Sequence, residues 1–295
     1  MNEPWLAFTQ PAVRDLAWLI GTPPLLTPTP DAPSFSGVYW PSTAYFSELL
    51  AETLPLLHAL DQDPAQLIAH SENSRDYRLG VYVERLLSFW LAHPDNPRYA
   101  LVAANLPVRD HGITLGELDY LVRDKRDGLL MHWELAVKFY LGRPEANLDQ
   151  QWLGPGLHDR LDIKRDHLCQ QQLQLSQRSI TREAIDAHLA ATHQAPLGER
   201  PIARVCWLKG RLFGASDAHW AVADPAQGNA EALRGQWWID DSLLMLAQSV
   251  DTQKPSNAHS LSADFNQPRL RGARLFQTHW SVPADWPNTA YSPRR

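Results

Sequence analysis

Two segments of the chain, residues 114–122 and 129–141, alternate apolar side chains with polar ones, as half-buried strands do. In the second segment every odd position is apolar, whereas the even positions include His132, Glu134 and Lys138. Alternate side chains of a strand point to opposite faces of a sheet. We therefore expect the odd face to pack on a core, and the even face either to meet solvent or to line a cleft.

The first of these segments adds two acids, Glu117 and Asp119, on one strand face. Residues 124–128 between the segments have the composition of a tight turn, which predicts a β-hairpin. If the two polar faces coincide, these acids meet Glu134 beside Lys138. Oxygen-rich clusters suit Mg²⁺ or Mn²⁺, so the hairpin is a candidate metal site.

A helix expected at about 76–92 offers a further acid. Its apolar side chains run almost all the way round, and Gly80 and Glu84, four residues apart, share one face. A glycine there would permit close approach to a sheet, and an acid in so apolar a helix usually needs a partner. Glu84 is therefore a candidate ligand, with pairing to Arg78 or Arg85 at the surface as the alternative.

The order of these acids resembles the PD-(D/E)XK phosphodiesterase superfamily, the restriction-endonuclease-like fold shared by many nucleases. More narrowly, most of the chain is similar to a bacterial family catalogued as domain of unknown function 1853. The motifs that carry the superfamily resemblance are Gly80-x-x-x-Glu84, Glu117-Leu118-Asp119 and Glu134 with Lys138. Those that carry the narrower family resemblance are the segment 116–142, Gly154-Pro155 and the run from Asp159 to Lys164.

The superfamily resemblance assigns roles to four residues. Asp119 matches the metal-binding aspartate, Glu134 the acid of the motif, Glu84 the helix glutamate of some branches, and Lys138 the motif lysine. The chain departs from the pattern because Ala136 stands where the lysine is usual, two residues after the acid, and because no proline precedes the aspartate. Glu134 and Lys138 start about 13 Å apart along a strand, where the usual spacing gives about 6.6 Å.

The resemblance implies metal-dependent hydrolysis of a phosphodiester in nucleic acid, DNA more than RNA. Mg²⁺ or Mn²⁺ would be held by Asp119 and Glu134 together with Glu84 or Glu117, and Lys138 would orient the attacking water or neutralise developing charge. A helix predicted at 158–178 follows the motif strand and adds three weaker substrate-binding candidates, which are Arg160, Lys164 and Gln171.

Two other interpretations stand beside this one. Glu134 and Lys138 have the alternation of any half-buried hairpin, and His132 is expected to be an ordinary exposed or hydrogen-bonded histidine rather than a ligand. The displaced lysine favours a catalytically inactive relative of the nucleases that binds or scaffolds, whereas the two acids favour the enzyme. Metal binding that depends on Asp119 would distinguish them.

The elements that must position these residues predict an α/β fold: a restriction-endonuclease-like core, with a mixed central sheet flanked by helices. Residues 1–74 read as a helical extension with a Pro-rich loop, 75–200 as the nuclease-like core, and 201–295 as an aromatic-rich β extension packed on the same core. Outside the hairpin we expect helices at 10–20, 44–60 and from 181, a loop at 22–43, strands at 99–105, 203–208, 211–213, 236–239 and 273–280, and a loop at 251–263.

The composition of the chain limits the possible classes of protein further. The chain has 295 residues, two cysteines, twelve tryptophans and a formal net charge of -6, so neither a disulfide framework nor a strongly basic nucleic-acid coat protein is expected. Most tryptophans are expected to pack in cores. The first residues do not read as a signal peptide, no apolar run is long enough to span a membrane, and no P-loop or dinucleotide motif occurs. These features predict a cytoplasmic protein without a nucleotide cofactor or membrane partner, and they leave its oligomeric state open.

Overall fold

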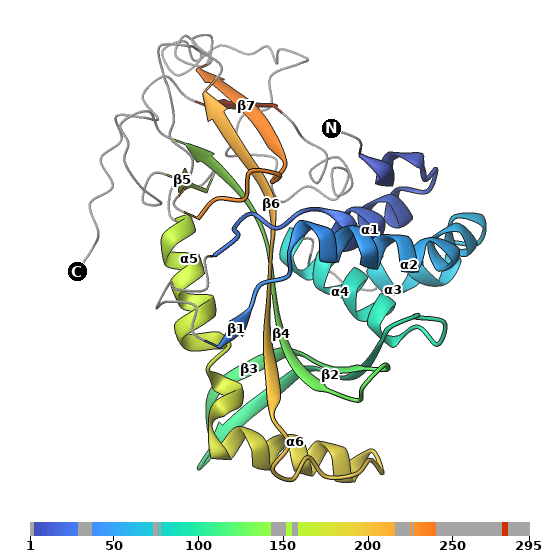
Figure 1. The fold of residues 1–295 in the computed structure, drawn as a ribbon, viewed down its shortest axis with the longest axis vertical. Coiled ribbons are helices and arrows are strands. Elements are labelled where there is room, and N and C mark those ends of the chain that lie inside the picture. Colours follow the sequence, from blue (N-terminus) through green and yellow to red (C-terminus); the bar gives the residue numbers. More distant parts are fainter. Residues whose placement is uncertain are drawn as a thin grey trace.

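The computed structural model describes residues 3–28, 37–72, 76, 78–142, 152–154, 159–215, 225, 227–239 and 279–282. These residues form a mixed sheet that curls and is flanked by helices (Figure 1). The predicted α/β class is therefore confirmed at that level. The predicted loop at 251–263 and residues 273–278 of the last predicted strand lie outside the described residues.

The sheet combines an antiparallel half with a parallel half. β2, β3 and β4 pair in antiparallel fashion, and β4, β6, β7 and β8 continue in parallel, while the short β1 joins β6 and β5 joins β4. The predicted hairpin is thus present as β3 and β4. The strands are β1 (Val38–Tyr39), β2 (Tyr99–Asp110), β3 (Ile113–Asp124), β4 (Leu130–Gly142), β5 (Trp152–Leu153), β6 (Ile202–Ala215), β7 (Arg234–Ile239) and β8 (His279–Val282).

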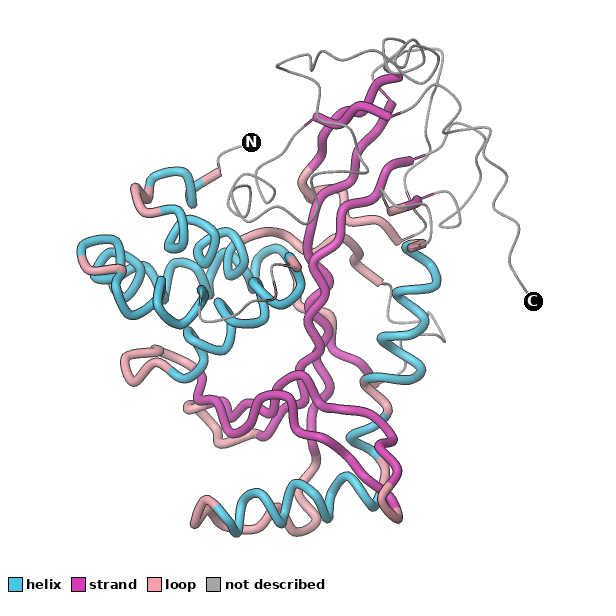
Figure 2. Tube along the Cα trace, turned by 180° about the vertical axis from the view of Figure 1, so that it is seen from behind, coloured by secondary structure: helices cyan, strands magenta, loops and turns pink. Residues whose placement is uncertain are grey.

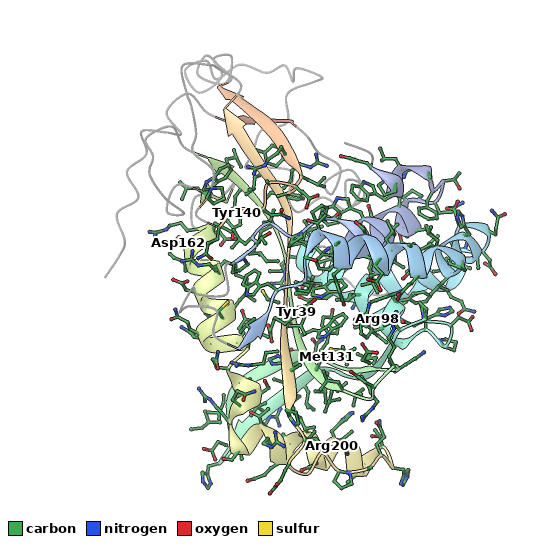
Figure 3. All side chains as sticks on the ribbon, in the orientation of Figure 1. Tyr39, Arg98, Met131, Tyr140, Asp162 and Arg200 are labelled. Carbon is green, nitrogen blue, oxygen red and sulfur yellow. The ribbon has the colours of Figure 1, made fainter. Side chains whose placement is uncertain are left out.

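The helices cover both faces of this sheet. Figures 1 and 2 show α1 to α4 gathered on one side of the long strands β4 and β6, with α5 on the other side and α6 beneath β2 and β3. In Figure 3, Tyr140 and Asp162 mark the side covered by α5. The helices are α1 (Pro11–Gly21), α2 (Thr43–Gln62), α3 (Ala65–Glu72), α4 (Leu79–Ala92), α5 (Leu161–His167) and α6 (Ser179–Ala191).

The apolar face of β4 packs on the core under α1 to α4, as its odd-numbered pattern predicts. At the centre of that core Trp133 of β4 and Trp207 of β6 stack with ring centroids 4.8 Å apart, and Trp90 of α4 lies against Trp207. All three are buried, in agreement with the expected core role of the tryptophans. This face therefore fixes β4 on the helices and leaves its other face for the site.

Several predicted boundaries differ from the observed ones. The strands expected at 203–208 and 211–213 are one strand, β6, because Gly210 adopts a positive φ of 143° inside the strand rather than forming a turn. The helix expected at 158–178 ends as α5 at His167 and continues as a π-helical turn over Leu168–Gln172 and a 3-10 turn over Leu175–Gln177. No glycine or proline marks these changes, so the sequence pattern ran on as one helix.

Other differences are smaller. β2 extends to Asp110, the loop expected at 22–43 contains β1, and α3 had not been predicted. β6, which begins the predicted C-terminal extension, pairs with β4 along twelve residues in the interior of the sheet. Among the described helices, none combines the length and apolarity that crossing a membrane requires.

One buried acid in this core gives a testable pH dependence. Asp15 of α1 is fully buried, accepts a 2.8 Å hydrogen bond from the Tyr82 hydroxyl, and has a raised pKa of about 7 because burial disfavours its charge. The folded protein therefore keeps a proton that the unfolded chain releases near pH 4, so this contribution to stability is complete below about pH 4 and is lost as pH rises to about 7.

Asp15→Asn removes the titration and keeps an acceptor for Tyr82. We expect its free energy of unfolding, relative to the wild type, to rise by about 2–3 kcal/mol between pH 5 and pH 8. Chemical denaturation of both proteins at the two pH values measures this change. Parallel pH profiles would show that Asp15 carries a charge in the folded protein.

Candidate active site

The candidate site lies where β3 and β4 part. Their ladder runs from Arg123 paired with Leu130 to Tyr120 paired with Trp133, and stops there. Beyond this point β3 continues along β2, while β4 continues along β6 toward the upper end of the molecule in Figure 1. The next residues along the two strands, Asp119 and Glu134, stand on opposite sides of this fork.

Side chains take over from the ladder at the fork. The backbone N–H of Leu135 donates to Asp119 Oδ2 at 3.1 Å, and the backbone N–H of Asp119 lies 3.5 Å from Glu134 Oε1. Burial raises the pKa of both carboxyl groups, and the charge of Glu134 raises that of Asp119 further. The hairpin thus brings together the two acids that the sequence placed on matching strand faces.

Glu84 and Glu117 lie near this pair of acids. Glu84, on α4, has a raised pKa of about 7, first because of burial and then because of the charges of Asp119 and Glu117. Glu117 is exposed on β3. The Tyr120 hydroxyl donates to the Glu84 carbonyl at 2.7 Å and holds α4 on the sheet. A Cβ at Gly80 would meet nothing closer than Glu84 Oε1 at 3.9 Å, so the glycine is not the point of close approach expected of it.

His132 is more deeply buried than its sequence context suggests. Its side chain is completely covered, and its Nε2 lies 2.7 Å from Glu134 Oε1. Burial lowers its pKa to about 4, so the ring is neutral near pH 7. The position of His132 on the same strand face as Glu134, two residues earlier, was the signal that could have identified it.

The other oxygen of Glu134 is bound by a residue that the sequence missed. Gln172 Nε2 donates to Glu134 Oε2 at 2.6 Å, and Gln172 Oε1 accepts from Lys164 Nζ at 3.1 Å. In an α-helix the residue seven positions after Lys164 would share its face, which is Gln171. The π-helical turn inserts one extra residue, so Gln172 faces the site and Gln171 is exposed.

The remaining predicted residues point elsewhere. Lys138 Nζ forms an ion pair with Asp159 Oδ2 at 2.5 Å rather than reaching Glu134, and the Tyr140 hydroxyl lies 3.4 Å from the other oxygen of Asp159. Arg160 pairs with Asp162 within the first turn of α5. Of the three basic side chains predicted for the site, Lys164 is the one that reaches Glu134 through a hydrogen-bonded neighbour.

The donor set suits a hard cation held partly by water and substrate. No group of three or more His, Cys, Asp and Glu side chains within the described ranges is arranged to hold a metal ion. Mg²⁺ differs from Ca²⁺ or Zn²⁺ in that one or two carboxylates, completed by water and substrate phosphate, commonly hold it. Asp119 and Glu134, which come together at the fork, are the residues of this site that could hold such an ion.

Comparison with known proteins gives one match. The family model described as "Domain of unknown function (DUF1853)" matches residues 14–258. No curated protein and no solved structure matches the chain.

Proposed function

This chain belongs to the DUF1853 family, whose description names no activity. We therefore propose a function from the site itself. The protein is a metal-dependent phosphodiesterase that cleaves nucleic acid and prefers DNA to RNA. The observation that carries the proposal is the contact between Asp119 and Glu134 at the fork between β3 and β4. There, the buried Glu134 and the half-buried Asp119 take the place of the strand ladder and lie close to the ammonium of Lys164.

The proposal includes membership of the PD-(D/E)XK superfamily with a restriction-endonuclease-like core. Its support is the order of elements: α4 with Glu84, the antiparallel strands β2 to β4 with Asp119 and Glu134, then α5, then the parallel strand β6. In this order Glu84 lies on α4, Asp119 on β3 and Glu134 on β4, with β2 between α4 and β3. The lysine departs from the superfamily pattern, since Lys138 is paired with Asp159.

The side chains then have distinct tasks. Asp119 and Glu134 would hold Mg²⁺ or Mn²⁺, which acidifies a bound water and offsets charge on the phosphate. Gln172 keeps Glu134 Oε2 in place and accepts from Lys164, so the ammonium stays beside the carboxylates. Lys164 would donate to a phosphate oxygen, the task that the motif lysine performs elsewhere. Glu84 and Glu117 add negative charge that favours the cation.

A second function, a nuclease-like protein that binds without cleaving, is favoured by one observation. The residue nearest to the usual motif lysine, Lys138, is held by Asp159. Such a protein needs no metal at Asp119. The two functions therefore predict different effects of divalent cations on stability.

Thermal unfolding in EDTA, Mg²⁺ and Mn²⁺ separates them. At 10 mM Mg²⁺ and a dissociation constant of about 1 mM, the wild type would gain about 1.4 kcal/mol, or an unfolding midpoint about 2–3 °C higher. Asp119→Asn is expected to lose this rise and, in EDTA, to unfold no earlier than the wild type because one of two repelling carboxylates is gone.

Asp95→Asn is the matched control, since Asp95 is an exposed acid in the turn after α4, and it should keep the metal-linked rise. A rise in the wild type would be followed by cleavage assays on single- and double-stranded DNA and RNA. A wild type that is indifferent to both cations would overturn the metal enzyme and leave the binding protein.

A further inference from the structure

We propose that His132 is a positioning residue that donates from Nε2 to Glu134 and so fixes the orientation of this carboxylate toward a bound divalent cation. This inference rests on the proposed function and names a residue that the motif does not include. Its basis is the 2.7 Å contact between His132 Nε2 and Glu134 Oε1 in a fully buried environment.

The ring of His132 is fixed by the sheet on both sides. In the strand register His132 lies opposite Leu121 of β3 and Arg204 of β6, two residues before the fork. Side chains two residues apart on one strand face start about 6.6 Å apart, which an imidazole and a carboxylate can span. The His132 ring is therefore positioned by regular strand pairing on both sides of β4. Glu134 lies where the pairing with β3 ends.

The hydrogen-bond partners determine which nitrogen carries the proton. His132 Nδ1 is buried and has no hydrogen-bond partner within the part of the chain that the structure describes. A neutral imidazole has one N–H and one lone pair. A glutamate that holds a cation is ionised. With the proton on Nε2, the N–H then meets this carboxylate and only a lone pair is left without a partner. The opposite tautomer would leave an N–H unpaired and would set two acceptors against each other.

Glu134 is then held at both of its oxygens. His132 donates to Oε1 and Gln172 donates to Oε2, the latter at 2.6 Å. The terminal torsion of a glutamate is otherwise broad. Each carboxylate oxygen has a second lone pair. That of Oε1 faces the backbone N–H of Asp119 at 3.5 Å, and that of Oε2 remains for a bound cation. Partners that orient a ligating side chain in this way commonly change metal affinity 10- to 100-fold when they are removed.

Stability alone does not account for a histidine at this position. An aromatic ring without nitrogen would fill similar space without burying the unpartnered Nδ1, but it would leave the buried Glu134 Oε1 without its donor. What the histidine provides at this position is therefore the hydrogen bond to Glu134. His132→Phe tests this directly, and His132→Gln is the conservative variant, because the glutamine amide can reach the position of Nε2.

The measurement is Mn²⁺ binding to the full chain by titration calorimetry, with thermal unfolding in EDTA as a second readout. We expect His132→Phe to stay folded in EDTA, with a cooperative unfolding transition, and to bind Mn²⁺ 10- to 100-fold more weakly. His132→Gln should bind within about threefold of the wild type. In cleavage assays, His132→Phe should need more Mn²⁺ for half-maximal activity while its KM for DNA stays unchanged.

Three outcomes are distinguishable. Wild-type affinity for Mn²⁺ in His132→Phe would overturn the positioning role alone, whereas a wild type that binds no Mn²⁺ would overturn the proposed function. Equal weakening of Mn²⁺ binding in the Phe and Gln variants would also overturn the positioning role, because packing rather than the hydrogen-bond donor would then be the cause. If His132→Phe does not fold, His132→Asn replaces it, since the shorter amide cannot reach Glu134.

Discussion

Replacing Lys164 by methionine is expected to reduce phosphodiester cleavage by about 10²- to 10³-fold, whereas Lys138→Met should stay within about threefold of the wild type. The two lysines carry the same charge and are both partly buried. They differ in their partners. Lys164 Nζ donates to Gln172, which binds Glu134, and Lys138 Nζ is paired with the carboxylate of Asp159.

This expectation reverses the assignment that the sequence motif implies. The superfamily pattern would make Lys138 the catalytic lysine, although Ala136 stands at the usual position. In the structure, burial raises the pKa of Glu134 and lowers that of Lys164, and the charge of Lys138 lowers the pKa of Lys164 further. Against these effects, the charges of Lys164 and Glu134 each favour the ionised form of the other. The ammonium of α5 is therefore the positive group best placed to stabilise charge on a phosphate held by the two acids.

Initial rates at saturating Mg²⁺ on a labelled DNA substrate measure the effect, and the metal-linked rise in unfolding temperature serves as the control for an intact carboxylate pair. Lys164→Met should keep that rise, since methionine removes the ammonium but no carboxylate oxygen. A large loss of activity in Lys138→Met with little loss in Lys164→Met would restore the motif assignment. Equal, small losses would show that neither ammonium stabilises the transition state.

The hairpin of β3 and β4, but not the fork at which its ladder ends, could be predicted from the sequence because the hairpin depends on local patterns. Strand alternation and turn chemistry specify the hairpin, and the hairpin register then sets Asp119 against Glu134. The apolar odd face of β4 likewise follows from alternation, and it is the face that meets α1 to α4.

The partners of Glu134 could not be predicted in the same way. Gln172 rather than Gln171 faces the site because a π-helical turn shifts the helix phase by one residue. No residue type in 168–172 predicts such a turn. His132 depends on burial, which requires β6 beside β4 and the layer of α5 above them. A pairing between strands sixty or more residues apart is determined by the whole sheet rather than by local composition.

Gly210 is a position at which the pairing of β4 with β6 requires a glycine. It lies opposite Lys138 in the parallel register of β4 and β6 and has a φ of 143°, a conformation that favours glycine. A Cβ added there would lie 1.7 Å from the backbone oxygen of Lys138 and 2.7 Å from its carbonyl carbon. Backbone atoms in the interior of a sheet cannot move away as a flexible side chain can, so the two central strands would have to separate.

We expect Gly210→Ala to destabilise the protein by more than about 4 kcal/mol and to yield mostly insoluble or unfolded chain. Two matched variants separate the causes: Gly112→Ala has a positive φ of 84° with no described atom within 4 Å of the new Cβ, and Gly214→Ala, in the same strand, has open space without a positive φ. Backbone strain alone should cost Gly112→Ala about 1–2 kcal/mol, and Gly214→Ala should change stability by less than about 1 kcal/mol. Denaturant unfolding of the three variants orders these effects. Because the β4–β6 pairing also carries His132 and Glu134, a Gly210→Ala protein as stable as Gly112→Ala would mean that the strands do not approach so closely, and the burial of His132 would then need another explanation.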